Sequence, residues 1–311
     1  MNALLLLSVI VAADPVPEAI ELKTKTGTIY GGIDLPEGKG PWPIVILHGG
    51  SGPTDRDGNN PQMKMNSLKL IGQALREKGF AVLRFDKRGI AASAKSLGKI
   101  EELKIDTYAD DVVEWVKLLR ADKRFSKVAF MGHSEGSMIG AIAAKSTKFD
   151  AFISLCGPGR PFDVLLIEQI SKDGKEYGDK SAEILKAIGK GEEPKDVPKV
   201  LAALFNKSIQ PYIRSCMAHD PAQEIAAIPC PTLIVSGSTD IQVAEADFNA
   251  LVQAKPKAKS VRLKNMNHVL KEFEKTNKFL QLTTYMNPDL PLHPQLAPAL
   301  VSFLTESLAA K

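Results

Sequence analysis

The stretch KVAFMGHSEGSMIG, residues 127–140, decides the fold of this chain. Residues 127–131 form an apolar run typical of a buried strand, and the small residues at 138–144 are typical of a closely packed helix. Between them lies the pattern Gly-x-Ser-x-Gly, whose two glycines permit a sharp strand-to-helix turn. Such a turn places Ser134 at a helix N-terminus, where the helix dipole and free amides favour a developing negative charge. The pattern therefore predicts Ser134 as a nucleophile.

Strands and helices are predicted to alternate on both sides of this unit. Apolar runs that indicate strands lie at residues 43–47, 80–85, 151–155, 232–235 and 260–263, and helical patterns lie at residues 68–75, 112–119, 243–251 and 294–308. Residues 19–26 and 28–35 alternate apolar and polar side chains around Gly27, which predicts a hairpin. Repeated strand–helix units fold as a parallel sheet that helices cover on both faces. We therefore expect an α/β fold with a mostly parallel, twisted eight-stranded sheet and the hairpin at one edge.

Residues 157–229 interrupt this rhythm. The segment is rich in Lys, Glu and Gly and has helical patches at 182–188 and 197–205, without a strand pattern. It predicts a helical insertion that divides the core into residues 14–156 and 230–311. Insertions at the carboxyl ends of strands often carry function, so a lid over the site is expected. A solvated surface excursion is the alternative.

The first residues, MNALLLLSVIVAA at positions 1–13, form an apolar stretch that is too short to span a bilayer. They end in small residues typical of a cleavage site, which predicts a secretory signal peptide and a secreted or periplasmic protein. The segment lacks the basic residues that usually begin a signal peptide. A buried N-terminal strand is the alternative.

Composition excludes several other classes of function. The formal net charge is +4 and the lysines are dispersed, without a basic patch among aromatic residues, so nucleic acid is not an expected partner. The chain has three cysteines and no C-x-x-C pair, so no zinc site is predicted, and neither a metal nor an organic cofactor is expected. Cys216 and Cys230 either form a disulfide in an exported protein or remain buried thiols.

A serine nucleophile needs a base, and the base needs an orienting acid. In a sheet of this strand order the acid follows the serine and the histidine comes last. His268 follows a strand closely and can reach the carboxyl edge of the sheet, whereas His293 lies among prolines and is expected in a surface turn. Asp240 follows the turn after a strand, although a helix cap is an alternative role for it. Asp247 is expected on the solvated side of a helix.

This order of serine, aspartate and histidine resembles the α/β-hydrolase superfamily over nearly the whole chain after residue 13. The motif Asp86-Lys-Arg-Gly89 follows the fourth strand, and its Asp and Arg are expected to anchor loops. Residues 50–58, G-x-G-P-x-D-R-D-G, are similar to a loop of bacterial carboxylesterases related to dienelactone hydrolases, which carry a helical cap. The resemblance implies hydrolysis of carboxylic esters by Ser134 with Asp240 and His268.

The glycine loop that begins at His48-Gly-Gly-Ser-Gly-Pro is expected to approach the reacting carbonyl with its backbone. Attack by a serine creates an oxyanion, which preorganised amides stabilise. One amide is expected from Glu135, and the second from Gly50 or Ser51. The residues at 55–57, Asp-Arg-Asp, are expected to hold the loop by ion pairs or capping.

The sequence thus favours a serine esterase for small-molecule esters with small or medium acyl groups. The same three residues also serve peptidases and acyltransferases, and a hydrolase scaffold can become a non-catalytic binding protein. The physiological substrate and the oligomeric state remain open.

Overall fold

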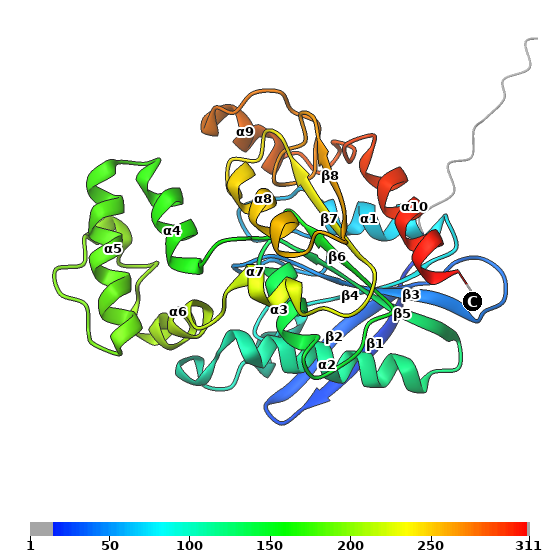
Figure 1. Ribbon diagram of the computed structural model, residues 1–311. Coiled ribbons are helices and arrows are strands. Elements are labelled where there is room, and N and C mark those ends of the chain that lie inside the picture. The colour runs from blue at the N-terminus through cyan, green and yellow to red at the C-terminus, as the bar shows by residue number, and fades with distance from the viewer. Residues whose placement is uncertain (1–14, 310–311) are drawn as a thin grey trace, which may run out of the picture.

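The computed structural model describes residues 15–309 (Figure 1). Residues 1–13, where the signal peptide is predicted, lie outside the described residues. Among the described residues, no helix combines the length and the apolar character needed to cross a membrane. Cys156, Cys216 and Cys230 are all free thiols, so the pairing of the last two is not formed.

One eight-stranded sheet forms the centre of the molecule, in the order β1-β2-β4-β3-β5-β6-β7-β8. The strands are β1 (Glu18–Thr24), β2 (Gly27–Asp34), β3 (Trp42–His48), β4 (Ala81–Phe85), β5 (Phe125–His133), β6 (Ala151–Leu155), β7 (Thr232–Gly237) and β8 (Lys259–Leu263). β1 and β2 form an antiparallel hairpin, β2 runs antiparallel to β4, and all other neighbours are parallel. The predicted sheet and its edge hairpin are confirmed.

Helices cover both faces of the sheet (Figure 1). They are α1 (Ser67–Arg76), α2 (Ile105–Ala121), α3 (Glu135–Ala143), α8 (Glu245–Ala254) and α10 (Leu296–Leu308), whereas α9 (Lys278–Tyr285) packs through Tyr285 in a separate small cluster with Met65 and Val269. Successive strand residues point to opposite faces, so Ile44 and Ile46 pack in one core with α2 and α3. Val45 and Leu47 pack in the other core with α1 and α10.

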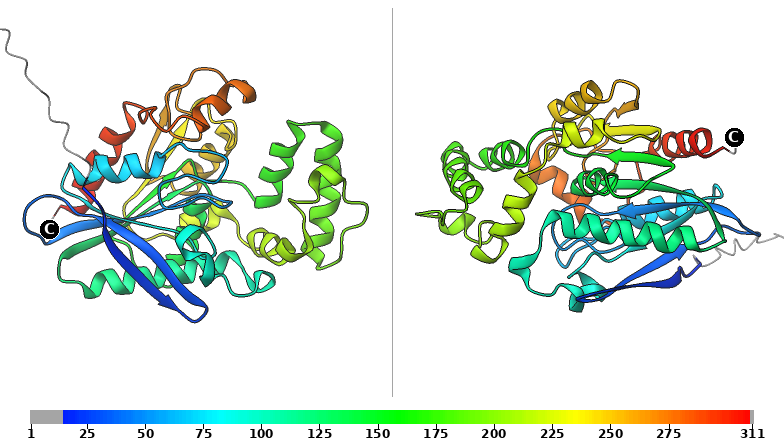
Figure 2. Two further views of the ribbon diagram at one scale, coloured as in Figure 1. Left: turned by 180° about the vertical axis from the view of Figure 1, so that it is seen from behind. Right: turned by 60° about the horizontal axis from the view of Figure 1, so that its bottom comes forward.

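The segment between β6 and β7 is a helical insertion. It contains α4 (Phe162–Ser171), α5 (Lys175–Lys190), α6 (Gln210–Met217) and α7 (Pro221–Ala226). Figure 2 shows α4 and α5 standing beside the sheet rather than on either of its faces. Apolar residues of the insertion form a separate small core that includes Ile184 of α5, Leu201 and Ile213 of α6.

The expected helix at residues 197–205 is wrong. The structure has a 3₁₀ turn at Lys199–Leu201 followed by further turns. Only Leu201 and Phe205 of this stretch are buried in the core of the insertion, and Val200 is 67% exposed. These two buried residues lie four positions apart, so one turn is enough to bury both side chains. A longer helix would add no further packing.

Candidate active site

Ser134 lies on a strained turn between β5 and α3. Its backbone has φ 54° and ψ −126°, a conformation that side-chain-bearing residues rarely adopt. Its amide donates to the carbonyl of Leu155 on β6 at 2.9 Å, which holds the turn against the sheet. A Cβ at Gly136 would lie 2.6 Å from the His48 carbonyl oxygen, and one at Gly132 would collide with the Gly136 backbone. Both glycines of the motif are therefore required by close backbone approach.

Asp240 and His268 are brought together from the loops after β7 and β8. His268 Nδ1 donates to Asp240 Oδ2 at 2.8 Å. The other carboxylate oxygen accepts from the amides of Gln242 at 2.8 Å and Val243 at 2.9 Å. Burial by itself would raise the pKa of Asp240, but the charge and hydrogen bond of His268 and the two amides hold that pKa below its usual range. Asp240 thus orients His268 and holds the turn that follows it, but it is not the cap of a helix, because α8 has Ala244 at its N-cap position.

This hydrogen bond fixes the tautomer of His268. An ionised carboxylate can only accept, so Nδ1 carries the proton and Nε2 keeps its lone pair. The His268 side chain is almost fully buried, and it lines a cavity of about 120 Å³ together with Ser134. Gly50 and Ser51 line the same cavity. Ser134, the predicted nucleophile, therefore lies at one cavity with His268 and the glycine loop.

His133, the residue before the serine, was not singled out by the sequence. Its Nε2 donates to the main-chain carbonyl of His268 at 2.8 Å, and the two rings lie 4.9 Å apart. Burial, and then the charge of His268, lower the pKa of His133 to about 3, so its ring is neutral at ordinary pH. His133 therefore ties the loop of His268 to the strand that carries the nucleophile.

The glycine loop approaches the serine as expected. A Cβ at Gly50 would lie 2.9 Å from the Ser134 Cβ, so no larger residue fits there. The ring of His48 donates from Nδ1 to the Gly49 carbonyl at 2.8 Å. Burial lowers the pKa of His48 to about 3, so this ring is also neutral. Gly50 and Ser51 both line the cavity beside Ser134.

The charged residues after the glycines hold the loop in place, as the sequence indicated. Asp55 Oδ1 accepts from the amides of Asp57 at 2.9 Å and Asn59 at 2.8 Å. Arg56 forms an ion pair with Asp86 at 2.7 Å. These contacts give the carboxylates a structural role in the loop rather than a chemical one.

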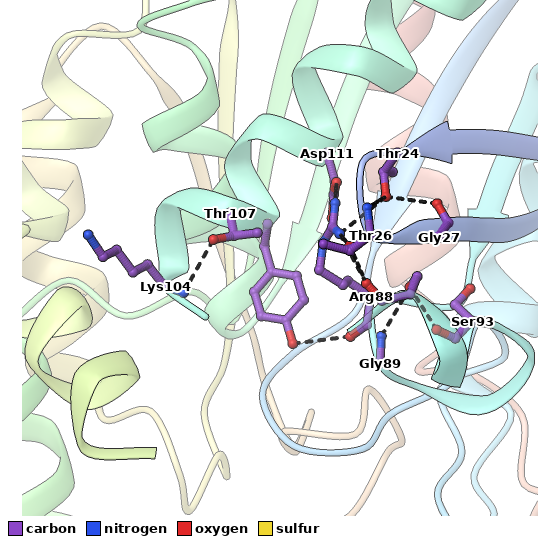
Figure 3. Close-up of polar contacts among 11 residues, drawn as sticks. Thr24, Thr26, Gly27, Arg88, Gly89, Ser93, Lys104, Thr107 and Asp111 are labelled. Carbon is purple, nitrogen blue, oxygen red and sulfur yellow. Dashed lines mark hydrogen bonds and ion pairs between the residues drawn. The ribbon is translucent and has the colours of Figure 1, made fainter. Parts of the chain in front are cut away.

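Arg88 anchors a different loop. Its Nε donates to Asp111 on α2 at 2.9 Å, and its Nη1 reaches Thr24 at 3.2 Å and also contacts Thr26 (Figure 3). Tyr108 on α2 donates to the Arg88 carbonyl at 3.3 Å. Between the two anchoring residues of this motif lies Lys87, which the sequence did not single out and which is buried beneath the glycine loop.

A second cavity of about 430 Å³ opens beside Ser134 and extends under the insertion. Its walls are mainly apolar and include Phe162, Leu165, Leu166, Leu204, Ile209 and Ile213. From residues 165–170 on α4, Leu165, Leu166 and Gln169 line this cavity. The stretch 200–205 contributes only Leu204, because its buried residues pack inside the insertion.

Two of the expectations about neighbouring residues are wrong. His293 is not on the surface; it is buried, and its Nε2 bonds to the Lys264 carbonyl at 3.0 Å. Asp247 is fully buried instead of solvated, because it accepts from the Arg160 guanidinium at 2.7 Å and from the Gly159 amide at 3.1 Å. Asp247 thereby fixes the beginning of the insertion to α8.

Cys156, Asp240 and His268 place possible ligand atoms within 4.8 Å of one another. Their chemistry does not suit a metal, because Asp240 and His268 already hydrogen-bond each other. Burial, and then the Asp240 charge, raise the pKa of the Cys156 thiol well above its usual range. A thiol that stays protonated is a poor metal ligand.

Comparison with known proteins agrees with this geometry. Residues 43–178 match the family model of the alpha/beta hydrolase fold. Over 268 residues the chain is 28% identical to esterase EstD of Thermotoga maritima, a match that covers 82% of this chain and 61% of that protein. The chain thus spans less than two thirds of the length of this curated relative.

Solved structures show the same architecture at low identity. Est1E from Butyrivibrio proteoclasticus superposes with a TM-score of 0.60 at 17% identity, covering 94% of this chain and 100% of that one. An esterase of Pyrococcus furiosus superposes with a TM-score of 0.56 at 14% identity, covering 94% and 91%. The sheet order, the strained serine turn and the match of residues 43–178 to the family model together show that this chain has the α/β-hydrolase fold.

Proposed function

We propose that this protein is a serine esterase that cleaves carboxylic esters of small or medium acyl groups through an acyl-enzyme. The observation that carries the proposal is the hydrogen bond between His268 and Asp240 beside the strained turn of Ser134. In a neutral His268 ring this bond leaves Nε2 as the nitrogen that can accept a proton, and His268 lines the same cavity as Ser134. The similarity to esterase EstD supports the same class of reaction.

In the first half of the reaction, Ser134 Oγ attacks the ester carbonyl while His268 Nε2 takes its proton. Asp240 stabilises the imidazolium that forms and keeps the ring oriented. The carbonyl oxygen becomes an oxyanion, which accepts from the Glu135 amide and from the glycine loop. The tetrahedral intermediate collapses, His268 returns its proton to the leaving alcohol, and the acyl group stays on Ser134.

In the second half, water replaces the alcohol. His268 takes a proton from the water, whose oxygen attacks the acyl carbon, and the same amides hold the second oxyanion. Collapse of this intermediate breaks the bond to Ser134 Oγ, which regains its proton from His268. The products are a carboxylic acid and the free enzyme.

The size of the cavity supports small and medium acyl groups. A volume of about 430 Å³ with mainly apolar walls suits an acyl chain or ring of limited length. Because α4 supplies Leu165 and Leu166 to these walls, we propose that the insertion acts as a lid that sets acyl preference.

A panel of p-nitrophenyl esters of graded chain length tests this function directly. We expect hydrolysis of the short and medium esters, and about 10⁴-fold or greater loss of kcat in Ser134→Ala. A matched p-nitroanilide and an added alcohol acceptor test the peptidase and acyltransferase alternatives. Hydrolysis of the anilide alone, or transfer without hydrolysis, would replace the esterase proposal, and a chain without any turnover would favour a binding protein.

We also propose that residues 1–13 are a signal peptide and that the mature protein is exported. N-terminal sequencing of the protein from the extracytoplasmic fraction should then begin at Asp14. A cytoplasmic protein that retains Met1 would contradict this proposal.

A further inference from the structure

Lys87 is a buried lysine without a carboxylate partner at ion-pair distance in the part of the chain that the structure describes. It is 3% exposed. Its Nζ donates to the main-chain carbonyl of Gly50 and, at 3.1 Å, to that of Gly52. It also lies 5.8 Å from the centre of the Tyr108 ring. Burying an ammonium group is unfavourable unless its hydrogen bonds are satisfied. The two carbonyls accept hydrogen bonds from Lys87 and so make its burial possible.

Both carbonyls belong to the glycine loop, one on each side of Ser51. A peptide unit is planar and trans, so the C=O of Gly50 and the N–H of Ser51 point in opposite directions. A carbonyl drawn to Lys87 therefore turns the Ser51 amide away from Lys87. Ser51 lines both cavities that Ser134 lines. Within residues 15–309, the Ser51 amide has no hydrogen-bond acceptor.

A counter-charge that acts on Lys87 is on the residue that follows Ser134. Burial lowers the pKa of Lys87, and the Glu135 carboxylate opposes this effect. The other titratable neighbours are neutral: the pKa values of His48 and His133 lie at about 3, and burial raises the pKa of Tyr108 above its usual range. Glu135 also contacts Tyr212 of the insertion. The Glu135 carboxylate at the start of α3 thus acts on Lys87 beneath the glycine loop and contacts Tyr212 of the insertion.

We infer that Lys87 is a positioning residue of the oxyanion hole: its ammonium group holds the Gly50 and Gly52 carbonyls and so directs the Ser51 amide at the oxyanion. This inference rests on the proposed function. It also selects Ser51 as a donor, where the sequence left Gly50 and Ser51 open. The His48 ring holds the preceding carbonyl in the same way, which leaves the Gly50 amide free to act beside it.

The effect of Lys87 should fall on the transition state. Loss of one oxyanion donor typically lowers kcat by about 10²–10³-fold. Lys87 only orients such a donor, so we expect Lys87→Met to lower kcat by about 10- to 100-fold with KM changed less than about twofold. Lys87→Arg retains donors that can reach the carbonyls and should recover part of the loss.

The experiment compares four proteins: wild type, Lys87→Met, Lys87→Arg and the control Lys117→Met. Lys117 lies on α2, where its side chain is 64% exposed and pairs with Glu114. For each protein, kcat and KM are measured with one p-nitrophenyl ester, and the inhibition constant is measured with a trifluoromethyl ketone, which forms an oxyanion on the serine. Thermal unfolding reports whether each variant is folded.

The inference holds if kcat and the affinity for the ketone fall together in Lys87→Met, rise again in Lys87→Arg and stay at wild-type values in Lys117→Met. It is overturned if Lys87→Met keeps its kcat, or if KM rises instead. Should Lys87→Met fail to fold, Lys87→Gln is measured in its place, and an unchanged affinity for the ketone overturns the inference. A wild-type protein that hydrolyses no ester contradicts the proposed function instead.

Discussion

His133 and His268 lie with their rings 4.9 Å apart, and His133 Nε2 donates to the His268 carbonyl at 2.8 Å. The residue next to the nucleophile thus holds the backbone of the proposed base. This contact joins β5, where the serine is presented, to the loop after β8. It fixes the distance between two groups that come from residues far apart in the sequence.

The burial of His133 predicts a pH-dependent stability. The pKa of His133 is about 3 in the folded protein, against about 6.5 for a free imidazole, so the unfolded chain binds more protons between these values. Stability should therefore fall as the pH falls from about 6.5 toward 3. His133→Asn should weaken this dependence, measured by urea unfolding at pH 7 and 4.5. A slope equal to that of the wild type would contradict the assignment.

Asp240 is expected to matter less than the serine. Asp240→Asn keeps the shape of the side chain but favours the wrong tautomer of His268, which costs about 10⁴-fold in comparable hydrolases. We expect a fall in kcat of about 10²- to 10⁴-fold, smaller than that of Ser134→Ala. Steady-state kinetics on one ester checks this order, and an unchanged kcat would point to another carboxylate.

Gly50→Ala should inactivate the enzyme without unfolding it. The new methyl group would lie 2.9 Å from the Ser134 Cβ, so either the loop or the serine must shift. Gly189→Ala is the control, because its methyl group would lie 3.2 Å from the flexible end of Met217, far from the serine. We expect kcat to fall about 10²-fold or more only in Gly50→Ala, with similar melting temperatures for both variants. Equal activity of the two variants would show that the loop does not approach the reacting carbonyl.

Leu165→Trp tests the insertion as a determinant of acyl length. Leu165 lines the large cavity, so a larger side chain should exclude longer acyl groups and shift kcat/KM toward short esters. Its neighbour Val164 is 44% exposed and does not line the cavity, so Val164→Trp is a matched control on the same helix. If both variants keep the wild-type chain-length profile, the insertion does not set acyl preference.

Local sequence patterns were enough to predict most of the fold. Strands and helices alternate with clear hydrophobic periods, and the strained turn at Ser134 follows from two glycines around a serine. Asp240 and His268 could be proposed because each follows a strand, and parallel strands bring their carboxyl ends to one edge of the sheet. Chain order and strand positions are enough to predict these two residues, without any knowledge of side-chain packing.

Residues whose position depends on packing could not be predicted in this way. The sequence pattern predicts that Asp247 is a solvated helix residue. In the structure the guanidinium of Arg160, at the beginning of the insertion, covers it. Lys87 lies in a charged motif, which favours a surface position. In the structure the glycine loop covers it. His133 occupies a variable position of its motif, and its partner is a main-chain carbonyl that no sequence pattern reveals.

The role of Ser134 as nucleophile is tested most directly by an organophosphonate with a good leaving group. We expect one phosphonate per chain, located on Ser134 by peptide mass spectrometry, and ester hydrolysis that disappears in proportion to labelling. His268→Ala should react far more slowly, because no base then takes the serine proton. A phosphonate on a different serine, or full ester hydrolysis by a chain completely modified at Ser134, would contradict the proposed mechanism.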